Sequence, residues 1–294
     1  MHPLRPLAAA IGVLIAASAT PTLAADDTFA SFAVDTDVKL SSDQRTRGIS
    51  DSLNRPGLKL SVQVAHESGL IGLVEISTVS KKQFLDGNGL GVTLAGGYRF
   101  GDPEGWHFGA GLATELFPGA GFDAPHGFDM ETGTPTDLRH TKYDSVFAVA
   151  EIGYGALEGR LLNVLSKTYR GADTGGVCAT LLALNADPTR GLACYGRGDH
   201  DSRGTWLADL DYQYSLGPAT SLNLHVGYQK VANFKEADFA DVRVGVTHKQ
   251  WGFEWSADWL STRTRADELY LALDGSKLRA TDDDALVVSL SRRF

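Results

Sequence analysis

Residues that carry acid–base or nucleophilic chemistry are thinly spread in this sequence. Among its eight histidines, His66, two residues before Ser68, and His140 are the weak candidates for a catalytic base. A nucleophilic site needs a base that is itself oriented by a third group. The sequence has no Gly-x-Ser-x-Gly, His-Glu-x-x-His or phosphate-loop motif, and no Gly-x-Gly-x-x-Gly followed by a helix. We therefore expect no enzyme activity, no cofactor and no metal site, and interpret both histidines as solvated turn residues.

Charged residues that alternate with apolar ones form a larger set of candidates. The acids are Asp35, Asp37, Asp43, Glu75, Glu115, Asp209, Asp211, Glu254 and Asp258. The bases are Lys39, Lys59, Arg45, Arg47, Arg99 and Arg243, with His107 and His225. An enclosed wet channel suits these residues, because an Arg or Lys facing lipid at mid-membrane costs about 2–4 kcal/mol. We predict that they line a pore with a weak preference for cations; pairing into ladders that fill the interior is the alternative.

Strand-length segments with a period of two position these side chains. Residues 222–229 are typical, with Leu222, Leu224, Val226 and Tyr228 on one parity and His225 on the other. Successive side chains of a strand point to opposite faces, so each segment has an apolar and a polar face. We predict about twelve strands. They cover residues 32–40, 58–64, 70–80, 88–100, 105–117, 141–153, 156–168, 206–214, 222–229, 242–247, 251–259 and 284–294.

The connections between these segments alternate between short and long. Tight turns fall at 67–69, 101–105, 153–156, 216–219 and 248–250, and longer loops at 47–56, 81–88, 118–140, 170–204, 231–238 and 264–283. Outer-membrane barrels have this asymmetry, with short periplasmic turns and long outer loops. Aromatic residues such as Tyr98, Phe100, Trp106, Trp251 and Phe294 gather near the turns, where an interfacial girdle lies. A soluble β-sandwich, the competing interpretation, buries its aromatic residues instead.

The first 24 residues have the pattern of a secretory signal peptide. A weakly basic start with Arg5 precedes a short apolar run and small residues around Ala24. After it there is no run of 18 or more apolar residues. The net charge of −9 argues against a general nucleic-acid binder, which needs a basic face. We expect export, cleavage near Ala24 and a single domain over residues 25–294.

The two cysteines, Cys178 and Cys194, lie in one predicted outer loop. Because an exported protein meets an oxidising compartment, we predict a disulfide within this loop. In the chain-entropy model such a closure contributes about 3 kcal/mol.

Several segments resemble one known family. Residues 42–50, with the sequence Ser-Asp-Gln-Arg-Thr-Arg-Gly-Ile-Ser, are similar to a stretch near the start of the TorF family of porins. Residues 167–171, 222–229 and 241–247 look like further segments of that family. The terminal strand, which ends on Phe294, resembles the signal read by the barrel-assembly machinery. The resemblance implies an outer-membrane barrel with a porin role, without naming a solute.

Together these observations predict an all-β fold, a transmembrane antiparallel up-and-down β-barrel of about twelve strands in the outer membrane of a Gram-negative bacterium. The expected function is passive diffusion of small polar solutes or ions. The expected partners are outer-membrane lipids, lipopolysaccharide and the barrel-assembly machinery. Two alternatives stay open: a barrel enzyme of the lipase, deacylase or protease type, and a non-conducting adhesin or receptor whose 170–204 loop binds a partner.

Overall fold

The computed structural model describes residues 31–184 and 187–294, and residues 32–294 form one compact unit. The predicted signal peptide therefore lies outside the described residues. The unit is a closed barrel of twelve antiparallel strands, as the alternation predicted. In chain order the barrel strands are β1 (Phe32–Ser41), β4 (Gly57–His66), β5 (Leu70–Thr78), β6 (Leu90–Gly101), β7 (Trp106–Leu116), β10 (Ser145–Tyr154), β11 (Leu157–Val164), β12 (Trp206–Gly217), β13 (Thr220–Lys230), β14 (Phe239–Gln250), β15 (Phe253–Thr264) and β18 (Ala285–Arg293).

Each barrel strand pairs with its neighbours in the chain, and β1 closes the barrel against β18. The register keeps one parity consistent around the whole circle. Asp35 is opposite Gln63 on β4, for example, and His225 is opposite both Asp211 and Arg243. Because the side-chain period is two, this register places the polar side chains of all twelve strands on the same face of the barrel wall.

The two faces of the barrel wall differ sharply in polarity. Val34, Val38 and Leu40 of β1, and Val242, Val244 and Val246 of β14, are exposed on the outer face. The opposite parity carries the charged residues and faces the interior. Among the described residues, no helix has the length and apolar character needed to cross a membrane.

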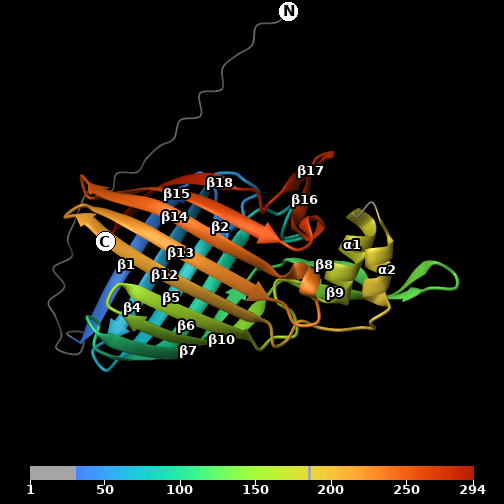
Figure 1. Ribbon diagram of the computed structural model, residues 1–294, viewed down its shortest axis with the longest axis horizontal. Helices are drawn as coiled ribbons and strands as arrows, with labels where there is room; N and C mark the ends of the chain where they lie inside the picture. Colours follow the sequence, from blue (N-terminus) through green and yellow to red (C-terminus); the bar gives the residue numbers. More distant parts are fainter. Residues whose placement is uncertain (1–30, 185–186) are drawn as a thin grey trace, which may run out of the picture. The chain divides into compact units, whose positions relative to one another are not determined.

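Tight turns close the end of the barrel at which the described chain starts and Phe294 stands (Figure 1). Trp251 and Gly252 form a two-residue link between β14 and β15, and both have positive φ, as a type I′ hairpin requires. Aromatic residues surround this end: Tyr98, Phe100, Trp106 and Phe108 are exposed there, and Trp106 lies 5.1 Å from Tyr154 between ring centroids. Exposed aromatic residues therefore gather near these turns, as the sequence predicted.

The long connections at the other end contain secondary structure that the sequence patterns did not predict. A ribbon of β8 (Gly121–Asp129) and β9 (Thr134–Lys142) precedes β10. A π-helix (Thr174–Cys178), α1 (Ala179–Leu184) and α2 (Thr189–Tyr195) follow β11, and β16 (Leu271–Asp274) and β17 (Lys277–Ala280) lie between β15 and β18. Two 3-10 turns, Lys235–Ala237 and Asp267–Tyr270, complete this end. Figure 1 shows these elements gathered beyond the barrel.

Three predicted strand boundaries were wrong. The tight turn predicted at 248–250 belongs to β14, because the link to β15 is formed by Trp251 and Gly252. The strand predicted at 156–168 ends at Val164. The segment predicted at 141–153 is split, because Thr141 and Lys142 belong to β9 and the barrel strand begins at Ser145. The break falls at Asp144, whose side chain accepts a hydrogen bond of 2.8 Å from the backbone of Phe117. This contact anchors the link between β9 and β10 to the end of β7.

Candidate functional site

A short hairpin after β1 folds into the barrel and narrows its interior. Its strands are β2 (Arg45–Thr46) and β3 (Ile49–Ser50), and we call residues 42–52 the constriction hairpin. Arg47 and Gly48 link the two strands, and both have positive φ. A side chain at position 48 would meet the hydroxyl of Thr262 on β15 at 2.1 Å, so the tip approaches the wall closely because it is glycine.

Arg47 joins the tip of this hairpin to the barrel wall. Its guanidinium donates two hydrogen bonds of 2.6 Å to the two carboxylate oxygens of Asp209 on β12. Both side chains are largely buried. A bidentate pair of this kind fixes orientation as well as position, because the planar fork matches the carboxylate.

The hairpin is also braced internally by Asp43. This carboxylate accepts hydrogen bonds from Arg45 Nε at 2.6 Å, Ser50 Oγ at 2.6 Å and Ser52 Oγ at 2.8 Å. The parity of Asp43 predicted that it faces the lumen. Instead its side chain is buried and holds the hairpin together. The parity rule failed here because the chain leaves the barrel wall after Ser41.

A second set of ion pairs, centred on Arg170, joins three segments at the loop end of the barrel. Arg170, which follows β11, donates to Glu115 on β7 at 2.8 Å and to Asp51 of the constriction hairpin at 2.9 Å. Burial disfavours the charged guanidinium, but the Asp51 and Glu115 carboxylates outweigh it and hold the pKa of Arg170 well above its ordinary value. The guanidinium carbon also lies 5.4 Å from the ring centroid of Phe117. Arg170 was absent from the predicted lumen set, although it lies in the segment 167–171 that resembles the TorF family.

A third charged group spans three neighbouring strands. His225 on β13 lies 2.9 Å from an oxygen of Asp211 on β12 and 3.1 Å from an oxygen of Asp241 on β14. Arg243 adds a contact of 3.2 Å to Asp211. Asp241 was not in the predicted set, although it has the inward parity of Arg243 on the same strand.

Three cavities follow one another along the barrel interior. The outer vestibule, of about 490 Å³, lies among the loops. The middle chamber, of about 430 Å³, is lined by the constriction hairpin and the loop-side half of the barrel, and the lower chamber, of about 400 Å³, by its turn-side half. Thr46 and Arg170 line both the vestibule and the middle chamber. Asp211 and Arg243 line both chambers of the barrel, so charged residues stand at each junction.

The predicted lumen residues divide into two groups in the structure. Eleven line the middle or lower chamber: Lys39, Arg45, Arg47, Lys59, Glu75, Glu115, Asp209, Asp211, His225, Arg243 and Asp258. The remaining six are Asp43, which braces the constriction hairpin, and five residues of inward parity that lie outside these cavities: Asp35, Asp37, Arg99, His107 and Glu254. Four of these five are paired near the turns: Asp35 with Arg293, Arg99 with Glu151, His107 with Glu158, and Glu254 with Lys249. Arg160 and Glu158 line the chambers as well and were missed, because residues 156–168 carry apolar residues on both parities.

The two weak catalytic histidines lie at opposite ends of the barrel. His66 is the last residue of β4, and its ring lies 2.7 Å from the hydroxyl of Ser68 in the turn that follows. His140 belongs to β9 at the loop end and lies 3.0 Å from an oxygen of Asp123, with both side chains exposed. No group of three or more His, Cys, Asp or Glu able to hold a metal ion is present within residues 31–184 and 187–294.

A helical cap, which we define as residues 172–184 and 187–200, packs over the loop end. Cys178 and Cys194 form the predicted disulfide within it. Their side chains belong to a buried apolar cluster with Leu181 and Phe234. The cap is thereby joined to the loop between β13 and β14.

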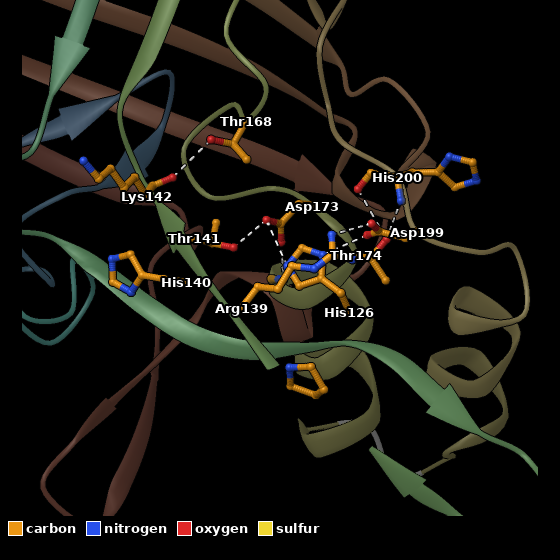
Figure 2. A network of polar contacts seen from close by, with 12 residues as sticks. His126, Arg139, His140, Thr141, Lys142, Thr168, Asp173, Thr174, Asp199 and His200 are labelled. Carbon is orange, nitrogen blue, oxygen red and sulfur yellow. Dashed lines mark hydrogen bonds and ion pairs between the residues drawn. The ribbon is translucent and has the colours of Figure 1, made fainter. Parts of the chain in front are cut away.

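Polar contacts tie the cap to the β8–β9 ribbon (Figure 2). Asp173 accepts a hydrogen bond of 2.5 Å from Thr141, and Asp199 lies 2.8 Å from both His126 and Arg139. Burial opposes ionisation of Asp199, but the contacts with His126 and Arg139 keep the pKa of its carboxyl below its ordinary value. The cap and the ribbon are therefore linked through paired charges.

Comparisons with solved structures found similar barrels at low identity. A NanC porin is 7% identical, with 88% of this chain and 98% of that chain covered at a TM-score of 0.48. A KdgM porin is 8% identical, with 88% and 99% covered at a TM-score of 0.44. An outer membrane channel from Pseudomonas putida F1 is 12% identical, with 89% and 95% covered at a TM-score of 0.38.

None of the curated proteins matches the chain. A family model does match, over residues 25–294, and its description is "Bacterial protein of unknown function (Gcw_chp)". Because this match spans nearly the whole sequence, the chain belongs to the Gcw_chp family.

Proposed function

We propose that the protein is an outer-membrane channel for passive diffusion of small polar solutes or ions. The observation that carries this proposal is the succession of three cavities through the barrel, with polar residues at each junction. A barrel filled by side chains alone lacks such a series of spaces. The porin role that the TorF resemblance of residues 42–50 implies agrees with it.

The wall of the barrel supports a membrane location. Exposed valine and leucine side chains on one parity suit contact with lipid, and the exposed aromatic residues near the turns suit its interface. We propose a signal peptide over residues 1–24, assembly through the terminal Phe294 strand, and lipid and lipopolysaccharide as the surrounding partners. A cofactor has no part in this function.

Selectivity would come from lumen width and charge. The middle chamber is lined by six acids, namely Asp51, Glu75, Glu115, Asp209, Asp211 and Asp241. Six bases face them, namely Arg45, Arg47, Lys59, Arg160, Arg170 and Arg243. This balance predicts weaker ion selectivity than the predicted lumen set of nine acids and six bases suggested.

Single-channel recording in a planar lipid bilayer tests the proposal. We expect discrete conductance steps from the refolded wild-type chain in KCl, and larger steps from a variant in which Arg47 and Asp209 are both replaced by alanine. A barrel that inserts and shifts on heating in gel electrophoresis but never conducts, in either form, would contradict a channel.

The helical cap favours a second candidate function. A disulfide-tied helical segment above a barrel mouth provides a stable surface, as a receptor or adhesin requires. Replacing the cap by a short glycine-serine linker distinguishes the two functions. A channel continues to conduct without its cap, whereas a non-conducting receptor shows no conductance before or after the change.

A further inference from the structure

The outer vestibule has the size and lining of a small-molecule site. Its volume of about 490 Å³ falls within the range of about 300–1,000 Å³ typical of ligand pockets. Such pockets have mostly apolar and aromatic walls with a few polar groups that orient the ligand. The aromatic residues of its wall are Phe84, Phe122, Tyr143, Tyr169, Phe239 and Tyr270.

These rings come from opposite sides of the barrel. Phe84 precedes β6 and Phe239 begins β14, and these two strands are half a circuit apart in the barrel order. On one side Tyr143 lies 5.3 Å from both Phe84 and Phe122 between ring centroids. On the other side Phe239 and Tyr270 meet edge to face at 5.7 Å. The aromatic residues of the vestibule wall therefore come from two opposite sides.

The charges around the vestibule are already compensated. Among the described residues that line it, none is an Asp or Glu, and Lys82 and Arg170 are the cations. Lys82 is paired with Asp274 of β16, and Arg170 is paired with Asp51 and Glu115. A charged ligand therefore finds no unpaired counter-charge in this wall, whereas an uncharged ligand leaves these pairs intact.

Two side-chain amides of the wall hold hydrogen-bond acceptors without a partner. Oε1 of Gln83 and Oε1 of Gln229 are buried and accept no hydrogen bond from the described residues. The Gln229 side chain is held on its other side, where its amide nitrogen donates to the backbone oxygen of Ala237 at 3.3 Å. A buried acceptor left unpaired costs about 1–3 kcal/mol. Both oxygens are closed off from solvent, so a donor in the vestibule pairs with them once the glutamine side chains turn toward it.

We infer that the vestibule binds a neutral, hydroxyl-bearing ring, such as a mono- or disaccharide, before it enters the charged middle chamber. The weakly polar C–H faces of a sugar ring pack against aromatic side chains, and its hydroxyls donate to the amide oxygens. The inference rests on the proposed channel function, because the vestibule shares Thr46 and Arg170 with the chamber below it. The inference names the class of solute that the proposed channel would carry.

Calorimetric titration of the full barrel with maltose tests this site, in lauryldimethylamine oxide so that the detergent carries no sugar. We expect saturable binding that weakens about fivefold in Gln229→Leu, because one hydrogen bond to the ligand is lost. The matched control is Gln250→Leu, which makes the same change in an exposed residue at the turn end of β14 and should bind as the wild type does. Gln83→Leu provides a second test in case Gln229→Leu does not fold.

Further measurements distinguish this inference from the proposed function. Glucuronate should bind more weakly than maltose, since its carboxylate has no free counter-charge, and equal or tighter binding would overturn the neutral-ligand assignment. Wild-type affinity in both glutamine variants would overturn the site. If KCl conducts but maltose neither binds nor blocks the current, the inference is wrong and the channel stands. If maltose binds but no current flows, the channel proposal fails and the assigned site remains.

Discussion

Arg47 and Asp209 are joined by two hydrogen bonds of 2.6 Å although 162 positions separate them in the sequence. The pair ties the tip of the constriction hairpin to β12, nearly half a circuit of strands away from β1. Because both side chains are largely buried, removing one partner leaves the other charge uncompensated.

We therefore expect Arg47→Ala to lower the free energy of unfolding by roughly 3–5 kcal/mol. The double variant with Asp209→Ala should recover much of that loss, because no buried charge is left alone. Denaturant unfolding in lipid vesicles, monitored by tryptophan fluorescence, gives both values. Equal losses in the single and double variants would argue against a stabilising pair.

Arg170 controls the charge at the entrance to the middle chamber. Replacing it by glutamine leaves Asp51 and Glu115 without their shared cation, so we expect the reversal potential in a KCl gradient to shift toward cation selectivity. The control is Arg263→Gln, which removes the same charge from an exposed side chain that pairs with Asp284. A shift of similar size in both variants would mean that the selectivity does not arise at Arg170.

A charged substitution on the outward face of β6 should be tolerated far less than one on its inward face. Leu94 is exposed on the outer face, whereas its neighbour Thr93 lines the middle chamber. We expect Leu94→Lys to destabilise folding into lipid vesicles by about 2–4 kcal/mol at mid-membrane depth. Thr93→Lys should fold normally and change the conductance instead. Equal folding of the two variants contradicts a lipid-facing wall.

The disulfide should stabilise the helical cap locally. Cys178 and Cys194 are 16 positions apart, and their removal by a double serine substitution should cost about 3 kcal/mol in the chain-entropy model. Hydrogen exchange is expected to increase in residues 172–200 while the barrel strands keep their protection. Intact-mass analysis without reductant should find no alkylatable thiol, and two modified thiols would disprove the pairing.

The contact between the cap and the β8–β9 ribbon should weaken in acid. The pKa of Asp199 is lowered in the folded protein from its ordinary value of 3.8 by the contacts with His126 and Arg139. A lowered acid pKa contributes its full stabilisation above the unfolded value, near 3.8, and loses it as the pH falls through the folded value. Hydrogen exchange of residues 173–200 should therefore rise below about pH 4. Asp199→Asn should show high exchange already at neutral pH and a smaller response to acid.

Much of the fold could be predicted because it depends on local alternation. The period of two in residues such as Leu222–Gln229 gives each strand its apolar face, and the positions of the turns set the count of twelve. The same alternation places Lys59, Glu75 and Asp258 on the parity that lines the chambers. The disulfide was predictable because the chain has two cysteines in one loop.

The arrangement of the interior depended on contacts between distant segments. The sequence pattern does not predict that residues 42–52 fold into the barrel. Their position depends on the close approach of Gly48 to Thr262 and on the pairing of Arg47 with Asp209. Arg170 reaches the middle chamber from a loop, where strand parity has no meaning. The sequence by itself determined the strands, their faces and the covalent link in the cap. Only the tertiary structure decided which charges meet and where cavities remain, because barrel closure brings together side chains whose separation along the chain carries no information about their distance in space.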